Sequence, residues 1–156
     1  MWFPETESIQ HVAVRWWQTG TGPGFKVTSR GRATNTIGTW MQKPGLHVLT
    51  FYPAGAASEQ HSGKFVLKID SHALTLDVKG RTRWTHTFFE GQIQASTMHE
   101  GGKVIPLVTE CKDLDAYVDA DVGDVYLQLV LMDGDDKYPI TFNVQFGRVD
   151  KLKERN

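Results

Sequence analysis

The chain has 156 residues, a length that suits one domain with a two-layer core. Its 17 Lys and Arg residues almost balance its 18 Asp and Glu residues, and the formal net charge is −1. Nucleic-acid binders usually carry a basic excess that displaces counterions from phosphates, so we expect no nucleic-acid partner.

Apolar and polar residues alternate along most of the chain, which predicts short β-strands separated by turns. In chain order we expect strands over residues 9–17, from 25 onward, and over 46–52, 65–69, 74–78, 83–89, 125–132 and 140–146. Turns or loops are expected over residues 31–38, 53–62 and 133–136. Residues 90–112 contain three glycines and Pro106, which exclude a long helix and leave room for a short one.

The most apolar stretch, residues 125–132, is expected to be a strand buried on both faces. Together with the strand at 140–146 it defines the predicted core residues: Val125, Leu127, Leu129, Phe142 and Val144. No segment repeats at a fixed period and no linker divides the chain. The sequence therefore predicts a single all-β domain over residues 1–156, either a sandwich or a barrel.

Cys111 is the single cysteine, so an intrachain disulfide is impossible. No apolar run before Val12 has the length of a signal peptide, and no window has the length of a membrane span. We expect a protein that is cytoplasmic or secreted without a signal peptide.

Motifs for metal binding and catalysis do not stand out. Zinc-binding histidines usually lie about two to four residues apart. Here the closest two of the six, His61 and His72, lie eleven apart (72 − 61). The acidic residues 133–136 lack the alternating oxygen ligands of a calcium loop, and no nucleophile-elbow motif is present. We expect no metal, no cofactor and no enzymatic activity.

Aromatic residues are interleaved with residues that can read hydroxyl groups. The aromatic residues are Trp16, Trp17, Trp40, Tyr52, Trp84 and Tyr117, and the polar ones are Arg15, Asn35, Asp77, Arg81 and Arg83. Aromatic faces pack against the C–H groups of sugars, so the mixture favours carbohydrate. The alternative is that most of these aromatic side chains pack in the core.

Seven short motifs occur in a common order along the chain. They are Val14–Thr19, Gly38–Trp40, His47–Thr50, Ser62–Gly63, Arg83–Trp84, Leu114–Tyr117 and Asn143–Gly147. In order and spacing they resemble the fungal fruit-body lectins, which have the actinoporin-like fold. The resemblance implies a two-sheet β-sandwich with one short helical connection near residues 90–112.

The resemblance also implies glycan binding, with galactose- or N-acetylgalactosamine-containing glycans as ligands. The family's first sugar site keeps Ser62 and Gly63, but its His-Asn pair is replaced by Lys79 and Gly80. Only Tyr117 remains of the second site. The expected ligand-binding residues are therefore Ser62, Gly63, Lys79, Gly80, Arg81, Trp84 and Tyr117.

The expected partners are cell-surface glycans or glycoproteins, with membrane contact weak or made through glycans. A homo-oligomer is expected because single sugar sites are weak and gain strength through avidity. Lys79 adds a cationic donor, which favours acidic glycans, unless it is only a solvated turn residue. Two alternative functions stay open: a membrane-acting cytolysin of the same fold, and a structural or assembly protein.

Overall fold

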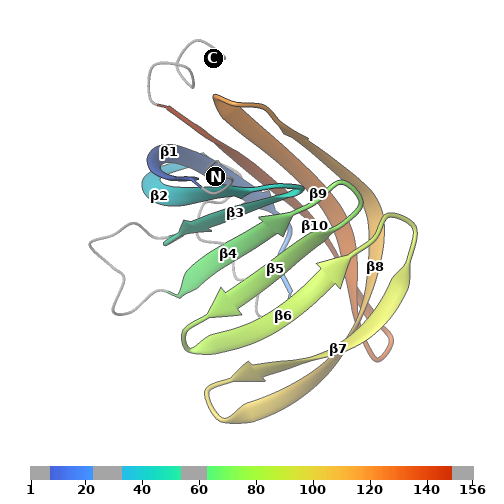
Figure 1. Cartoon of the computed structure of the whole chain (residues 1–156). Coiled ribbons are helices and arrows are strands. Elements are labelled where there is room, and N and C mark those ends of the chain that lie inside the picture. The colour runs from blue at the N-terminus through green and yellow to red at the C-terminus, as the bar shows by residue number, and fades with distance from the viewer. Residues whose placement is uncertain (1–7, 23–32, 54–62, 149–156) are drawn as a thin grey trace.

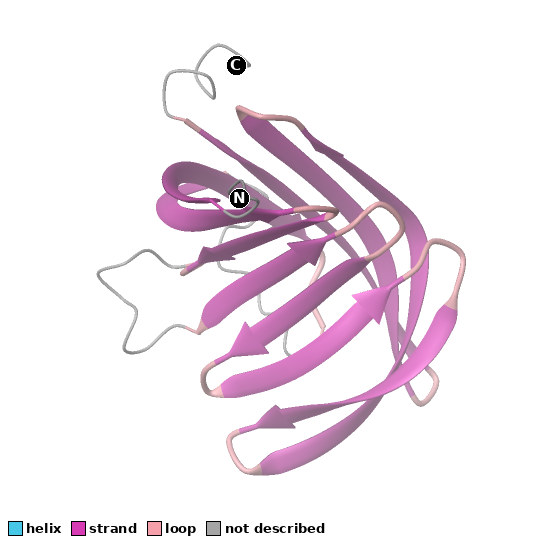
Figure 2. Ribbon diagram, viewed as in Figure 1, coloured by secondary structure: helices cyan, strands magenta, loops and turns pink. Residues whose placement is uncertain are grey.

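The structure is a computed structural model that describes residues 8–22, 33–53 and 63–148. In these residues ten antiparallel strands form one sheet, which closes on itself as a barrel (Figure 1). The strands are β1 (Ser8–Thr19), β2 (Thr34–Lys43), β3 (Leu46–Phe51), β4 (Lys64–Ile69), β5 (Leu74–Lys79), β6 (Thr82–Phe88), β7 (Ile93–Glu100), β8 (Lys103–Val118), β9 (Val122–Asp133) and β10 (Asp136–Gly147). Each strand pairs with its neighbours in the chain, and β10 pairs back onto β1. The described part contains strands and loops without a helix (Figure 2), and therefore no helix that could span a membrane.

The all-β prediction is confirmed, but the predicted two-sheet sandwich is wrong. One strand decides the difference: β1 pairs with both β2 and β10, so that Ala13 lies opposite Ile37 on one side and Gly147 on the other. A sandwich keeps its first and last strands at sheet edges or in separate sheets, whereas here they join. The ring that results has one interior and one outer face.

The predicted helical connection over residues 90–112 is also wrong. These residues form most of the β7–β8 hairpin, paired from Ile93 with Glu110 to Glu100 with Lys103. The glycines that interrupt the pattern lie at the turns: Gly91 has φ 82°, and the hairpin turn is formed by Gly101 (φ 55°) and Gly102 (φ 87°). These glycines lie at the ends of the two strands, because only the turns require a positive φ.

Large side chains from alternate positions fill the barrel interior. Trp16 of β1 is 2% exposed, and its ring lies 5.9 Å from both Phe65 and Phe142 between centroids. Its indole Nε1 donates a hydrogen bond to the carbonyl oxygen of Pro53 at 2.9 Å, so the polar edge of the ring is also paired. The interior is therefore a packed aromatic core at this level of the barrel.

The predicted core in β9 and β10 is confirmed, because all five residues are 0% exposed. The prediction that residues 125–132 are buried on both faces is wrong. Tyr126 and Val130 are only half-buried and Gln128 is exposed, since none of the described strands packs on the outside of this sheet. Residues 125–132 form an almost continuous apolar run because apolar side chains also occupy some of the partly covered outer positions, between the inward-facing ones.

Residues 31–38 were expected to form turns, but β2 begins at Thr34 and includes Gly38. A Cβ atom at Gly38 would lie 2.6 Å from the carbonyl oxygen of Thr50 on β3. The glycine therefore allows a close approach between two strands instead of forming a turn.

The ring is uneven where β6 meets β7. Sheet pairing between these strands is confined to Thr82 with Glu100 and Arg83 with His99. Beyond these two pairs the strands diverge, as Figure 1 shows, and each continues to pair only with its other neighbour.

Truncation of Leu127 tests the assignment of the inner face. Leu127 is 0% exposed, so Leu127→Ala should lower the free energy of unfolding by about 2–5 kcal/mol through lost contacts and a cavity. Gln128→Ala, at the exposed neighbouring position, should cost less than about 0.5 kcal/mol. Urea denaturation of both variants measures the difference, and similar losses would mean that the faces are assigned incorrectly.

Candidate functional site

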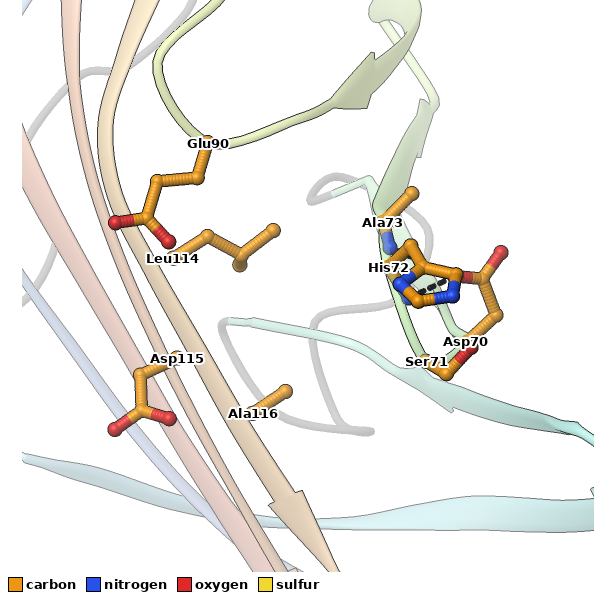
Figure 3. Close-up of a pocket in the computed structure, with 8 residues that line it drawn as sticks. All are labelled: Asp70, Ser71, His72, Ala73, Glu90, Leu114, Asp115 and Ala116. Carbon is orange, nitrogen blue, oxygen red and sulfur yellow. Dashed lines mark hydrogen bonds between the residues drawn. The ribbon is translucent and has the colours of Figure 1, made fainter.

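One end of the barrel carries a hollow of about 370 Å³ between the β4–β5 turn and β8. Its lining residues are Asp70, Ser71, His72, Ala73, Glu90, Leu114, Asp115 and Ala116 (Figure 3). A second hollow, of about 240 Å³, shares Asp70, Ser71 and Ala116 with the first. The two hollows therefore adjoin, and together we call them the end groove; the volume of the larger one is in the range of small-molecule sites.

One wall of the end groove is a tight turn held by Asp70. Its Oδ1 accepts hydrogen bonds from the backbone N–H groups of His72 at 2.8 Å and Ala73 at 2.7 Å. The N–H of Asp70 donates to the carbonyl oxygen of Ala73 at 3.1 Å. Such an Asp-led turn stabilises the end of a strand and fixes the position of the following side chains, including the imidazole of His72.

The opposite wall comes from β8 and the β6–β7 turn. Figure 3 shows Leu114 and Ala116 pointing from β8 toward His72 and Ala73, whereas the carboxylate of Asp115 points to the other side of the strand. Glu90 lies above Leu114. The lining is thus mixed: the apolar side chains of Leu114, Ala116 and Ala73 lie among polar ones, which include the carboxylates of Asp70 and Glu90.

His47 lines the second hollow and has a defined protonation state. The Nε1–H of Trp40 donates to its Nδ1 at 3.2 Å, so the neutral imidazole carries its own proton on Nε2. Burial lowers the pKa of His47, which favours this neutral form. The groove is therefore lined by a neutral imidazole at one side and by carboxylates at the rim of the other.

The thiol of Cys111, close to the end groove, is buried and protonated at neutral pH. The residue is 2% exposed, and burial, together with the charges of Glu90 and Asp113, raises the pKa of its thiol to about 11. A thiol of this pKa is almost entirely protonated at neutral pH. Among the described residues, no group of three or more His, Cys, Asp or Glu side chains is arranged to hold a metal ion.

Four of the seven residues predicted from the sequence, Gly63, Lys79, Gly80 and Arg81, lie at the other end of the barrel. The backbones of Gly63 and Gly80 touch: a Cβ atom at Gly80 would lie 2.6 Å from the Cα of Gly63. Lys79 adjoins this contact and pairs with Asp77 at 3.7 Å between Nζ and Oδ2. Arg81 follows in the same β5–β6 turn and is exposed. Ser62 lies outside the described residues.

Trp84 is not on a surface. It is 2% exposed inside the barrel, donates from Nε1 to Ser96 Oγ at 2.8 Å, and stacks on His86 at 5.3 Å between ring centroids. Trp16 and Trp40 are likewise buried, so for these three tryptophans the core alternative is the correct one.

Tyr117 is 55% exposed near the end of β8, and its hydroxyl donates to Asp119 Oδ2 at 3.0 Å. Because successive turns alternate between the two ends of an antiparallel barrel, the β8–β9 turn lies at the end opposite to Lys79. The structure therefore does not bring Trp84 or Tyr117 together with Gly63, Lys79, Gly80 and Arg81.

The end-groove residues were missed because they are far apart in the sequence. Asp70, Glu90 and Asp115 belong to three different elements and share no motif. The one local signal was an Asp directly after an alternating strand, which is typical of the turn that Asp70 forms.

The comparisons with known proteins bear on the fold. No protein-family model matches the sequence, and no curated protein matches it. Among solved structures, the ywiB protein from Bacillus subtilis is similar, with a TM-score of 0.66 over 92% of this chain and 94% of that chain. The sequence identity is 13%. The likeness is one of fold alone.

Two histidines should make stability depend on pH. Burial lowers the pKa values of His47 and His86 in the folded chain, so the unfolded chain takes up protons first as the pH falls. The free energy of unfolding should therefore be at its full value above about pH 6.5 and decrease below it. Each proton of difference contributes at most about 1.4 kcal/mol per pH unit.

Denaturation at pH 7.5 and 5.5 measures this decrease. His86→Phe, which keeps an aromatic ring between Trp84 and Phe88, should reduce it. Leu127→Ala serves as the control, because it should lower stability equally at both pH values. A decrease of the same size in wild type and His86→Phe would show that His86 does not contribute.

Proposed function

We propose that this chain is a binding protein without catalytic activity, and that its ligand occupies the end groove. The ligand class that fits is a small organic cation, an amine or amidine attached to an apolar group. The observation that carries the proposal is the composition of the groove: a few apolar side chains that face each other across it, and carboxylates without a Lys or Arg among its described lining residues.

The apolar part of such a ligand would lie between Leu114 and Ala116 on one side and Ala73 on the other. These side chains offer contact area without polar groups that would need a partner. His72 adds a planar face at the same height.

The cationic part would lie near Glu90 and Asp70, which carry negative charge among the lining residues. No Lys or Arg is among the described residues that line either hollow, so the local potential at the rim is negative. A cation gains from this potential, whereas an anion of the same shape is repelled.

Binding is favoured over catalysis by what surrounds the groove. The nearby thiol of Cys111 is buried and protonated, and His47 uses Nδ1 to accept a hydrogen bond from Trp40. No described hydrogen bond joins a nucleophile to a base among the lining residues, which is the arrangement that covalent catalysis requires.

Three benzene derivatives of similar shape test the proposal: benzamidine (cationic), benzamide (neutral) and benzoate (anionic). In NMR titrations benzamidine should bind best, benzoate worst, and added salt should reduce the difference. Glu90→Gln should weaken benzamidine binding about 2- to 5-fold and leave benzamide unchanged, because only the ion pair is lost.

Two further variants complete this experiment. Ala116→Trp should abolish binding of all three compounds by filling the groove. Asp135→Asn, with the same charge change in the exposed β9–β10 turn, should have no effect. Equal affinity for the three compounds would contradict the proposal.

Carbohydrate binding, as in the fungal fruit-body lectins, stays a second proposal. It now rests on the opposite end of the barrel, where the backbones of Gly63 and Gly80 are in contact and Lys79, Gly80 and Arg81 are exposed. Exposed backbone and cationic donors suit an acidic glycan. Trp84 cannot supply a stacking surface there, since it is buried.

A titration with a sialylated glycan and its neutral counterpart tests this second proposal. The acidic glycan should bind more tightly, and Lys79→Ala should remove the preference, more so at low salt. Lys112→Ala, which removes a similarly exposed ion-paired lysine on β8, is the control. Absence of binding to either glycan would exclude the site.

A further inference from the structure

The barrel has an open seam between β6 and β7. We define the seam by Thr85–Phe88 on β6 and Ile93–Met98 on β7. In the described part of the chain these stretches pair with β5 and β8 respectively, but not with each other. Each therefore presents one row of backbone N–H and C=O groups without a sheet partner, as an edge strand does.

Both edges of the seam lack the usual protection against added strands. Natural edge strands carry charged residues, prolines or bulges that discourage pairing. Thr85–Phe88 and Ile93–Met98 contain no Lys, Arg, Asp, Glu or Pro. The charged residues nearby, Arg83 and Glu100, lie where the two strands are already paired.

The seam is closed at both of its ends, which limits what can enter it. The β6–β7 turn closes one end, and the two paired positions close the other. The open edges are four residues long on β6 and six on β7, counted from Thr85–Phe88 and Ile93–Met98. An added strand would thus have about four to six residues.

A hydrogen bond crosses beneath the seam. Trp84 Nε1 donates to Ser96 Oγ at 2.8 Å, and both side chains belong to the inward-facing positions of their strands. At this level the two strands are thus linked through side chains, while their backbones are not paired as sheet neighbours. The inner side of the seam is covered by side chains, while the backbone edges above it are not paired.

We propose that the seam binds an extended peptide segment of a partner protein, which pairs with β6 and β7 at once. A second copy of this chain fits less well. In a second copy, β7 is already paired with β8 along its length. If that β7 entered the seam, the β8 attached to it would clash with the first copy. A single extended segment has both of its edges free and satisfies both rows of backbone groups.

The side chains beside the seam define the chemistry of the segment. Inward-pointing residues would meet His86, Phe88 and Met98, which are all buried, so they should be apolar. Outward-pointing residues would lie beside Thr85, Ala95 and Thr97, which are exposed, small and uncharged. The partner segment is therefore uncharged and alternates apolar with small polar residues.

Amide hydrogen exchange followed by NMR tests the proposal on the full chain. In the free protein the N–H groups of Thr85–Phe88 and Ile93–Met98 that face the seam should exchange much faster than those that face β5 and β8. The probe is an acetylated and amidated peptide of three Thr-Val repeats with a lysine at each end. At about ten times its dissociation constant, this peptide should slow exchange at the seam about ten-fold.

Two controls separate strand pairing from general adhesion. The same peptide with N-methylated valines should protect only one of the two edges, because it lacks the donors for the other. Thr97→Lys should weaken binding roughly five-fold or more by placing a charge on the edge. Gln128→Lys, at an exposed position of β9 that pairs with both β8 and β10, should not change it.

Three results would overturn the proposal. Slow exchange at the seam of the free protein would mean that the edges are already paired. Protection that grows with protein concentration without peptide would identify a second copy as the occupant. Equal protection by the N-methylated peptide would mean that backbone pairing is not involved.

Discussion

The pairing of the first strand with the last is the constraint on which the rest of this structure depends. Seven consecutive positions of β1, from Ala13 to Thr19, pair with β10, and this pairing turns an extended meander into a ring. Once the ring is closed, every strand has an inner and an outer face, and a residue's parity along its strand decides which it occupies. The core follows from this closure, because Trp16 of β1 and Phe142 of β10 can meet inside only when their strands are neighbours.

The closed barrel is interrupted at one place. Its interior is filled by tryptophan and phenylalanine side chains, and sheet pairing between β6 and β7 is confined to two positions. At that place Trp84 reaches Ser96 with its side chain, while the backbones of the two strands remain apart. The end groove reflects strand length, since β8 is the longest strand and its last residues, Leu114 to Val118, extend past the β4–β5 turn that they face.

Much of the fold could be predicted from the sequence, because alternation records which side of a strand is apolar. It placed Leu127, Leu129, Phe142 and Val144 in the core correctly. Alternation could not distinguish a sandwich from a barrel. A sheet needs one apolar face both when it packs on a second sheet and when it closes on itself. The glycines of residues 90–112 were assigned to an irregular segment, although their positive φ angles place them at the ends of regular strands.

The candidate sites were less predictable, for two different reasons. Trp84 could have been placed correctly, because it shares its parity with His86 and Phe88, which also face inward. The end groove could not, since Asp70, Glu90 and Asp115 come together only through the order of strands around the ring. Local motifs carry information about turns, whereas a groove between distant turns depends on topology.

The buried thiol of Cys111 has a practical consequence. It lies on β8 beside the β6–β7 turn, where the N–H of Gly91 donates to its carbonyl oxygen at 2.8 Å and its own N–H donates to Gln92 at 3.0 Å. With a pKa of about 11, only about one thiol in 10⁴ is ionised at pH 7. A thiol-specific dye added to the native protein would therefore react only when this corner of the barrel comes apart. The rate at which the dye labels Cys111, the single cysteine of the chain, would therefore report on that local opening.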